Sequence, residues 1–455
     1  MKRTNRLTEG NILHTLIRFA VPVFFTLFLQ ALYGGVDLLV VGQFAATADV
    51  SGVATGSMLM STVTMVITGL SMGITILVGE RIGRGEPDEA GRAIGGGICL
   101  FAAFGVLLTV VLLAGAEPLA RLLHAPEEAF AETVEYIRIC GGGSLFIVAY
   151  NVLGAVFRGI GDARTPLFTV MLACVINIGG DLLLVEGFHL GAAGAALATV
   201  ISQGISGLAC LVYMIKKFPI LHMSPEERRL DGRSCRTLCF MGVPMGLQYS
   251  ITAVGSIFLQ SAVNGLGSLY VAAVAAGAKL FQLLGCPYDA LGATMATYCG
   301  QNVGAVKLDR LGKGIRACSL LGLIYALAAF GAMLLFAPQS TMLFLDPTEP
   351  QLDTLVALTA QYVRILTAFF FPLALVNIVR FSIQGMGYSG LAILAGVMEM
   401  IARMAVALVF VPLFGYTAAC FASPAAWICA DAFLIPACMG SIARLKKIYA
   451  KAPEA

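Results

Sequence analysis

The chain has 455 residues, of which 58% are hydrophobic and only 12% are charged, and its net charge is +3. Because a water-soluble surface needs more charged residues than this, the composition predicts an integral membrane protein in contact with the lipid bilayer. The small positive excess leaves no basic stripe for nucleic acid, which we exclude as a partner.

Apolar runs long enough to cross a bilayer follow one another along the whole chain. At about 20 apolar residues per crossing, we expect an all-α fold with about twelve transmembrane helices. These helices are centred near residues 30, 66, 104, 146, 176, 203, 250, 284, 326, 368, 400 and 428. The first run is longer than the core of a cleavable signal peptide, about 7 to 15 residues, so we interpret it as a permanent helix.

Two acids interrupt the apolar runs of the first half. Asp37 falls in the first predicted helix, and Asp181 falls in the fifth, four residues after Asn177. This spacing places Asn177 and Asp181 on one helix face, about 6 Å apart along the axis. Counted from the expected helix ends, Asp37, Asp181 and Thr199 lie at similar depth.

Two carboxylates in a medium of low dielectric constant cannot both stay charged without a partner. Asp37 and Asp181 therefore predict a site that binds a proton or a metal cation. The alternative is a structural role, in which Asp37 snorkels toward a helix end and Asp181 forms a hydrogen bond within the fold. A charged residue in the membrane costs about 2.5 to 3.5 kcal/mol, which favours the functional interpretation.

The sequence repeats itself. Residues 79–83 (GERIG) return as residues 300–304 (GQNVG), 221 positions later, and residues 157–161 (FRGIG) return as residues 383–387 (IQGMG), 226 positions later. Six crossings per half return the chain to the same side of the membrane. We therefore expect two six-helix lobes related by a pseudo-twofold axis along the membrane normal.

The longest polar stretch separates these repeats. The predicted division is an N-terminal lobe at residues 1–218, a cytoplasmic linker at 219–236 and a C-terminal lobe at 237–455. Most of the 29 Lys and Arg residues fall in loops on the side of this linker, together with both ends of the chain. Positive loops stay in the cytoplasm, so we expect a multi-pass protein of the cell membrane with both termini cytoplasmic.

The second half has no acid that corresponds to Asp37 or Asp181, but it has charges of its own. Those within the predicted helices are Lys279, Asp289, Glu399, Arg403 and Asp431. Glu399 and Arg403 are four residues apart, which favours a structural ion pair that neutralises itself. The alternative is an exchange-sensitive charge network, comprising Lys279, Asp289, Glu399 and Arg403, that lines a cavity with Lys279 as a mobile cation.

The most specific segment, residues 158–166 (RGIGDARTP), is typical of a tight cytoplasmic turn. Thr165 can cap the next helix and Pro166 suits its first position. Together with residues 69–73 (GLSMG), 177–181 (NIGGD) and 300–305 (GQNVGA), this segment resembles the multidrug and toxic compound extrusion (MATE) family. The resemblance covers essentially the whole chain.

The resemblance implies an antiporter with twelve helices that exchanges inward-flowing Na⁺ or H⁺ for organic cations, drugs or toxic compounds by alternating access. The family's first-lobe cation site falls here on Asp37, Asn177, Asp181 and Thr199, and the two aspartates would bind the metal if the ion is Na⁺. Some relatives carry acids in helices 7 and 10, where this chain has Gln248 and Asn377.

A cavity for bulky organic cations needs aromatic, methionine and polar walls. The candidates are Tyr33, Met58, Met65, Tyr150, Gln248, Tyr249, Phe281, Met295 and Asn377. For each aromatic or methionine candidate, plain helix packing is the alternative.

A major-facilitator permease also has two parallel six-helix halves, and a lipid-linked precursor flippase has a similar plan; we keep both as alternatives. A membrane enzyme is disfavoured because all four histidines fall in loops or at helix ends, so we expect neither enzymatic activity nor a cofactor. We also expect a monomer.

Overall fold

The computed structural model describes residues 7–217, 232–345 and 349–451, which form helices joined by short turns. The predicted all-α fold is confirmed. The α-helices are α1 (Ile12–Phe44), α2 (Thr47–Arg84), α3 (Pro87–Leu122), α4 (Phe130–Gly142), α5 (Ser144–Ile160), α6 (Arg164–Asp181), α7 (Gly191–Lys217), α8 (Gly232–Asn264), α9 (Ser268–Gly304), α10 (Asp309–Met342), α11 (Leu352–Ala368), α12 (Phe370–Gly385), α13 (Ser389–Ala405) and α14 (Val411–Lys451). The short elements are η1 (Glu127–Ala129), η2 (Leu182–Gly187) and η4 (Val406–Phe410).

The helices of the described residues account for twelve crossings. Nine are long and apolar enough to span a membrane, and two bent pairs, α4 with α5 and α11 with α12, add two more. One of the nine, Ser389–Ala450, has 62 residues, which at 1.5 Å per residue is about 93 Å and too long for a single crossing. Gly415 interrupts it with φ 62° and ψ −142°, so this segment is two spans and the predicted number is confirmed.

Contacts divide the chain into two compact units. Unit 1 contains Phe25–Gly246, and unit 2 contains Leu7–Phe24 and the chain from Leu247 onward. Two helices therefore belong to both units: α1 changes unit two residues after Pro22, and α8 changes unit two residues after Pro244. The predicted division at residues 218 and 237 stays a prediction, and residues 219–231 of the proposed linker lie outside the described part of the chain.

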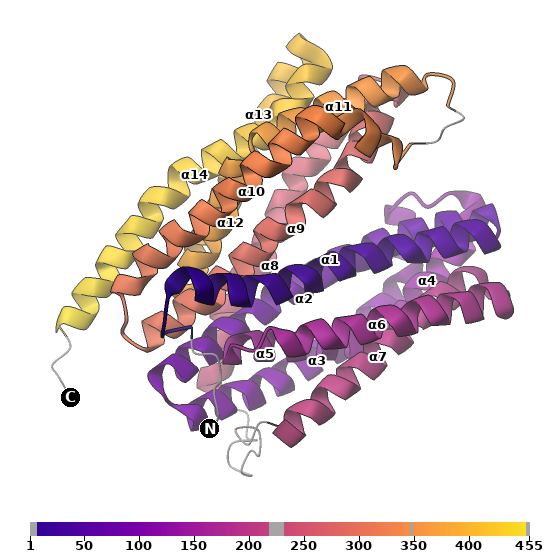
Figure 1. The fold of residues 1–455 in the computed structure, drawn as a ribbon. Coiled ribbons are helices and arrows are strands. Elements are labelled where there is room, and N and C mark those ends of the chain that lie inside the picture. The colour runs from indigo at the N-terminus through magenta and orange to yellow at the C-terminus, as the bar shows by residue number, and fades with distance from the viewer. Residues whose placement is uncertain (1–6, 218–231, 346–348, 452–455) are drawn as a thin grey trace. The chain divides into compact units, whose positions relative to one another are not determined.

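In unit 1, α2 packs against α3, α4 and α5, and α6 lies beside α7 (Figure 1). Helix α5 packs closely against α2 at Gly159, where an added Cβ would lie 2.9 Å from the Thr75 carbonyl oxygen. Next to it, the Thr75 hydroxyl donates a hydrogen bond of 2.9 Å to the Ala155 carbonyl oxygen. A side chain at position 159 would separate the two helices.

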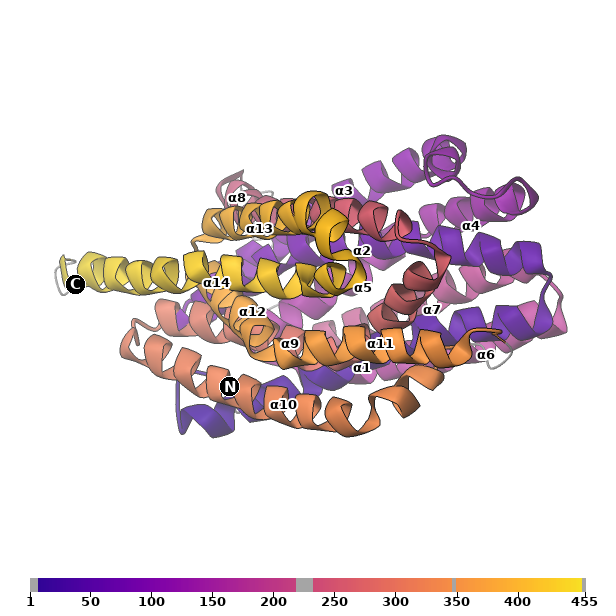
Figure 2. The same ribbon diagram turned by 90° about the horizontal axis from the view of Figure 1, so that it is seen from above.

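In unit 2, α9 packs against α10, α11 and α12, and α13 runs beside α14 (Figure 2). A Cβ added to Gly385 of α12 would lie 2.5 Å from the Ala296 carbonyl oxygen of α9. Gly385 follows Gly159 by 226 positions, and Ala296 follows Thr75 by 221 positions. These are the two displacements of the sequence repeat, so the same close helix contact is built once in each unit.

The start of the described chain is held by unit 2. The Leu7 backbone N–H donates to Gln301 Oε1 at 3.0 Å, and Asn302 Nδ2 donates to the Leu7 carbonyl oxygen at 3.3 Å. Lys307 Nζ donates to the Thr8 carbonyl oxygen at 3.0 Å. Leu7 and Thr8 are both buried. The repeated segment 300–304 therefore anchors the chain just before α1 begins.

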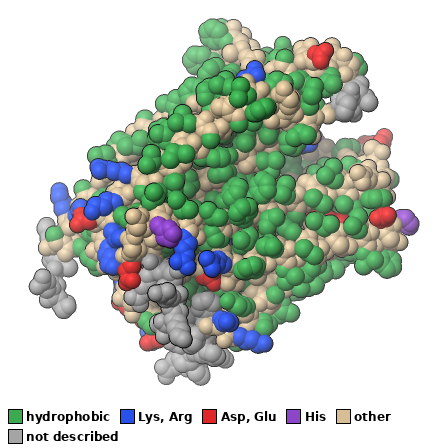
Figure 3. Space-filling view, in the orientation of Figure 1, with side chains coloured by type: hydrophobic (Ala, Val, Ile, Leu, Met, Phe, Trp, Pro, Cys, Tyr) green, Lys and Arg blue, Asp and Glu red, His purple; other side chains and the backbone are tan. Residues whose placement is uncertain are grey.

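Hydrophobic side chains cover most of the face shown in Figure 3, as expected for helices in contact with lipid. In unit 2, Lys and Arg side chains gather where α10 begins and α14 ends (Figure 3). Lys446 of α14 forms an ion pair there with Asp309 of α10. The basic side chains in this part of unit 2 therefore gather at one end of α10 and α14.

Candidate functional site

The four residues of the predicted cation site come together in unit 1. Asp37 lies on α1, Asn177 and Asp181 lie on α6, and Thr199 lies on α7. The Thr199 hydroxyl donates a hydrogen bond of 3.3 Å to Asp37 Oδ2. The Asp37 carboxyl group is also within side-chain reach of Asp181 and Asn177. Three helices thus bring two acids, an amide and a hydroxyl to one place.

This place is closed to solvent. Asp37 is 6% exposed, and Asn177 and Asp181 are completely buried. Asp37 Oδ1, both Asp181 oxygens and both amide atoms of Asn177 have no hydrogen-bond partner among the described residues. Buried polar groups without partners are unfavourable and rare in folded proteins. Among the described residues, neither a positive charge nor a hydrogen-bond donor therefore satisfies Asp37 Oδ1 or the two Asp181 oxygens.

The end of α6 determines the relative positions of Asn177 and Asp181. Asn177 and Asp181 are one helical turn apart, and Asp181 is the last α-helical residue before the π-helical turn η2. A π turn inside a helix is rare and is frequently found at functional sites. It shifts the side chains that follow Asp181 relative to those that precede it, so Asp181 lies at a break in the helical pattern.

The turn at residues 158–166 fixes the start of α6. Gly161 has φ 94°, and Asp162 Oδ1 accepts hydrogen bonds from the Arg164 and Thr165 backbone N–H groups at 2.9 and 3.1 Å. The capping side chain is therefore Asp162. Thr165, which the sequence suggested as the cap, instead donates its hydroxyl to Asp162 Oδ2 at 2.6 Å. Because α6 begins at Arg164, Pro166 is the third residue of the helix and not the first.

The predicted ion pair of the second half is confirmed. Arg403 Nη2 of α13 lies 3.4 Å from Glu399 Oε2. The sequence interpretation missed a third member, Arg380 of α12, whose guanidinium group donates to Glu399 Oε1. An arginine inside an apolar run was a signal that could have identified it. Its partner, however, lies 19 positions away on another helix, where periodicity gives no guide.

The other charges of the second half do not all join this cluster. Asp431 of α14 is buried, and its Oδ1 has no hydrogen-bond partner among the described residues. Asp289 of α9 is exposed but lies close enough to Arg380 for their charges to interact. Lys279 is exposed and forms no ion pair among the described residues. The structure therefore does not bring Lys279 to the network in which it was placed.

The predicted cavity residues of unit 1 fall into two groups. Tyr33 and Tyr150 pack together with Val170 and Cys174, and the Tyr33 hydroxyl accepts a hydrogen bond of 3.3 Å from Gln203 Nε2. Met58 and Met65 of α2 are instead exposed by 67% and 54%. Tyr33 lies one helical turn before Asp37 on α1.

The predicted cavity residues of unit 2 are mostly packed. Gln248 Oε1 accepts a hydrogen bond of 2.9 Å from Gln384 Nε2, and the Phe281 ring stacks on Trp427 with 5.8 Å between ring centroids. Met295 and Asn377 are buried, and Tyr249 is half-buried. Met295 in particular offers no exposed surface to a ligand in this structure. The role of all nine cavity residues stays a prediction.

Comparison with known proteins gives one family. The MatE family model matches residues 22–183 and 244–412. The chain is 29% identical over 379 residues to a probable multidrug resistance protein of Bacillus subtilis, YpnP, and the match covers 82% of each chain. It is 25% identical over 381 residues to a probable multidrug resistance protein of Thermotoga maritima, NorM, covering 82% of this chain and 80% of the relative.

Solved structures show the same fold. One is the outward-facing conformation of a multidrug resistance MATE family transporter of the MOP superfamily, which matches with a TM-score of 0.91 at 20% identity. The match covers 98% of this chain and 100% of that structure. The two segments matched by the family model begin at residues 22 and 244, which are the prolines where α1 and α8 approach their change of unit.

Proposed function

Because the chain belongs to the MATE family of multidrug efflux transporters, we propose that it is a cation-coupled antiporter that exports organic cations, drugs or toxic compounds. The driving ion is Na⁺ or H⁺, and transport proceeds by alternating access. Of the transporter classes that the sequence left open, the permease and the flippase have no separate observation in their favour.

The observation that carries this proposal is the unbalanced pair Asp37 and Asp181. Two buried carboxyl groups without an ion-paired partner require a bound proton or cation to be tolerated at low dielectric constant. The oxygens of both carboxyl groups, of the Asn177 amide and of the Thr199 hydroxyl are the hard ligands that suit a proton or Na⁺. Cation binding then favours the state that releases the drug outward.

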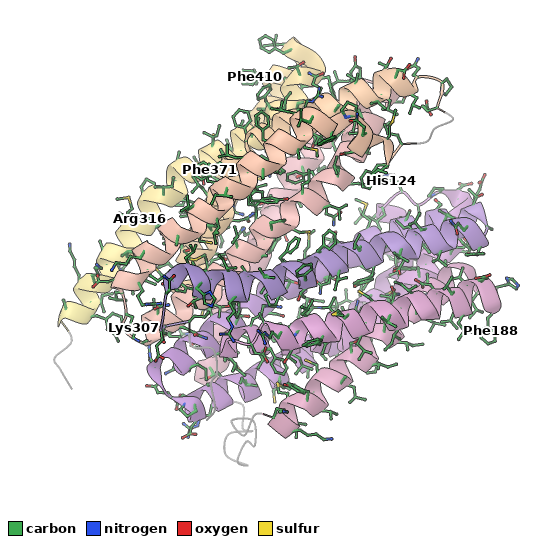
Figure 4. The ribbon with its side chains drawn as sticks, viewed as in Figure 1. His124, Phe188, Lys307, Arg316, Phe371 and Phe410 are labelled. Atoms are coloured by element: carbon green, nitrogen blue, oxygen red, sulfur yellow. The ribbon has the colours of Figure 1, made fainter. Side chains whose placement is uncertain are left out.

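The proposal includes an orientation in the cell membrane with both termini in the cytoplasm. In unit 2, Lys307 and Arg316 lie toward one end of the helices and Phe410 lies toward the other (Figure 4). Basic residues mark the cytoplasmic side of membrane proteins. The anchored segment at Leu7 is bound by Lys307 and lies toward the same basic end.

The substrate proposed here is a small organic cation with apolar parts. Aromatic faces attract such cations, and Tyr33 of unit 1, which is half-buried, has one four residues before Asp37. The two aspartates supply the negative charge for which ion and drug compete. This competition couples the inward flow of one to the outward flow of the other.

The test is ethidium efflux from vesicles that contain the purified protein, driven first by a Na⁺ gradient and then by a pH gradient. Asp37→Asn and Asp181→Asn should each insert normally but lose ion-driven efflux. Glu186→Gln, an exposed acid in η2, is the matched control and should behave as the parent. Unchanged efflux in both aspartate variants would refute the proposal.

A further inference from the structure

The buried acids of unit 1 have no fixed counter-charge. None of the ion pairs formed by the described residues includes Asp37 or Asp181. The polar groups nearest to Asp37 are Asp181, Asn177 and Thr199, of which none is basic. Within the described residues, unit 1 therefore holds two carboxyl groups whose charge no basic side chain balances by an ion pair.

Unit 2 holds two buried carboxyl groups as well, but with two guanidinium groups. Glu399 is ion-paired on one oxygen with Arg380 and on the other with Arg403. Asp431 is the second carboxyl group, and it lies close enough to Arg380 and Glu399 for their charges to interact. All four residues are buried, with exposures between 3% and 7%. This core is neutral when every member is charged.

The sequence repeat relates the two arrangements. Arg403 follows Asn177 by 226 positions, which is the displacement that also relates Gly385 to Gly159. Asn177 lies beside the acids of unit 1, and Arg403 lies beside the acid of unit 2. At the equivalent place in the fold, one unit thus has a neutral amide and the other has a permanent positive charge.

Further titratable groups face this core from the neighbouring helices. Asp289 of α9 and Tyr249 of α8 lie within reach of the Arg380 charge, and Tyr362 of α11 lies within reach of Arg403. Asp289 is exposed and Tyr249 is half-buried. Neither Asp289 nor these tyrosines form an ion pair among the described residues, and the cations that ion-pair with Glu399 there are Arg380 and Arg403.

We propose that Arg380 and Arg403 are tethered cations, whose guanidinium groups hold in unit 2 the place that an exchangeable ion holds in unit 1. A guanidinium group stays protonated in proteins and cannot leave its helix. The charge of unit 2 therefore stays constant through the transport cycle, and only unit 1 binds and releases the coupling ion. This inference rests on the proposed function for the role of unit 1.

Removing one tethered cation should create a vacancy for a free one. Arg380→Met leaves Arg403 against Glu399 and Asp431, so the buried core has an excess of one negative charge. A bound Na⁺ or proton would restore neutrality, and a ligand that binds only the folded state raises its stability. The variant should therefore acquire a dependence on cations that the parent protein lacks in this unit.

The experiment measures thermal unfolding of the purified full chain in a background in which Asp37→Asn and Asp181→Asn silence unit 1. Unfolding is followed in sodium chloride and in choline chloride of equal ionic strength, and in acidic and neutral buffers. In this background, adding Arg380→Met should make Tm about 2 °C or more higher in sodium chloride than in choline chloride, or in acidic than in neutral buffer. The background itself should show no such response.

Two matched variants isolate the charge. Arg380→Lys keeps the positive charge, and Arg380→Met with Glu399→Gln restores neutrality without it; both should be as insensitive to cations as the background. The neutral double variant should also be more stable than Arg380→Met alone, which provides a readout even if the single variant yields little folded protein. A flat response of Arg380→Met, or a double variant no more stable than the single one, would overturn the inference.

Failure of this inference and failure of the proposed function give different results. If Asp37→Asn and Asp181→Asn keep ion-driven efflux, the role of unit 1 is wrong whatever unit 2 does. If those variants lose efflux while Tm of the silenced background still responds to Na⁺ or acid, unit 2 exchanges an ion and the tethered-cation inference is wrong.

Discussion

Leu7 and Gln301 are joined by a hydrogen bond of 3.0 Å although 294 positions separate them in the chain. This bond, with those of Asn302 and Lys307, fixes the segment that precedes α1 onto the end of α9 and the turn that follows it. The start of α1 is thereby held in unit 2, while Asp37 near its other end belongs to unit 1.

Gln301→Ala should loosen this anchor. Loss of one buried hydrogen bond costs about 1 kcal/mol, so the Leu7 amide should exchange its hydrogen about five times faster than in the parent. Hydrogen exchange read by mass spectrometry measures this directly. Lys313→Ala, an exposed substitution on α10, is the control, and equal exchange in both variants would show that Gln301 does not hold the segment.

Thr199→Val should weaken the cation site without removing an acid. The substitution keeps the side-chain shape but removes the hydroxyl that donates to Asp37 Oδ2. We expect the half-saturating concentration of the coupling ion to rise about fivefold, the equivalent of about 1 kcal/mol. Thr199→Ser keeps the hydroxyl and should remain near the parent value in the same vesicle assay; if it loses as much as Thr199→Val, the hydroxyl is not the cause.

Asp162→Ala should destabilise the start of α6. The carboxyl group accepts two backbone N–H groups and the Thr165 hydroxyl, and loss of an N-terminal cap costs about 1 to 2 kcal/mol. Thermal unfolding should show a lower Tm, with Asp162→Asn intermediate because it keeps one carbonyl oxygen. An unchanged Tm in Asp162→Ala would mean that the cap contributes nothing to α6.

Gly159→Ala should lower the stability of the protein, although it adds only one methyl group. Its Cβ would meet the Thr75 carbonyl oxygen at 2.9 Å, so α5 and α2 must move apart. Overpacking of this kind costs about 1 to 3 kcal/mol. Gly154→Ala on the same helix meets only the flexible end of Arg158 at 3.5 Å. Expression and Tm should fall for Gly159→Ala and hold for Gly154→Ala; equal losses would contradict the close-contact argument.

Much of this fold follows from one-dimensional signals. Apolar run length gives the twelve spans, and the paired motifs give the repeat that reappears as the Gly159 and Gly385 contacts. The spacing of Asn177 and Asp181 places them on one helix face, because a helix fixes the direction of residues four apart. These features depend on geometry within one helix or on copies of one motif.

The features that the sequence did not reveal depend on contacts that form only in the folded chain. Arg380 reaches Glu399 from a different helix, and Asp162 rather than Thr165 takes the cap because the turn directs its carboxyl group at two backbone donors. Lys279 carries a charge in a predicted span, yet its side chain is exposed. Spacing along the chain cannot decide which of several charges becomes a neighbour.

The exchange of α1 and α8 between the units has a consequence for how the protein is made. The first part of α1, through Phe24, folds with a partner that has not been synthesised when it leaves the ribosome, and Gly232–Gly246 completes a body begun more than 200 residues earlier. A chain cut within residues 218–231 would yield two pieces, each lacking a strip of its own compact body. The compact units therefore do not coincide with the two sequence repeats, because each half of the chain supplies part of one helix to the other unit.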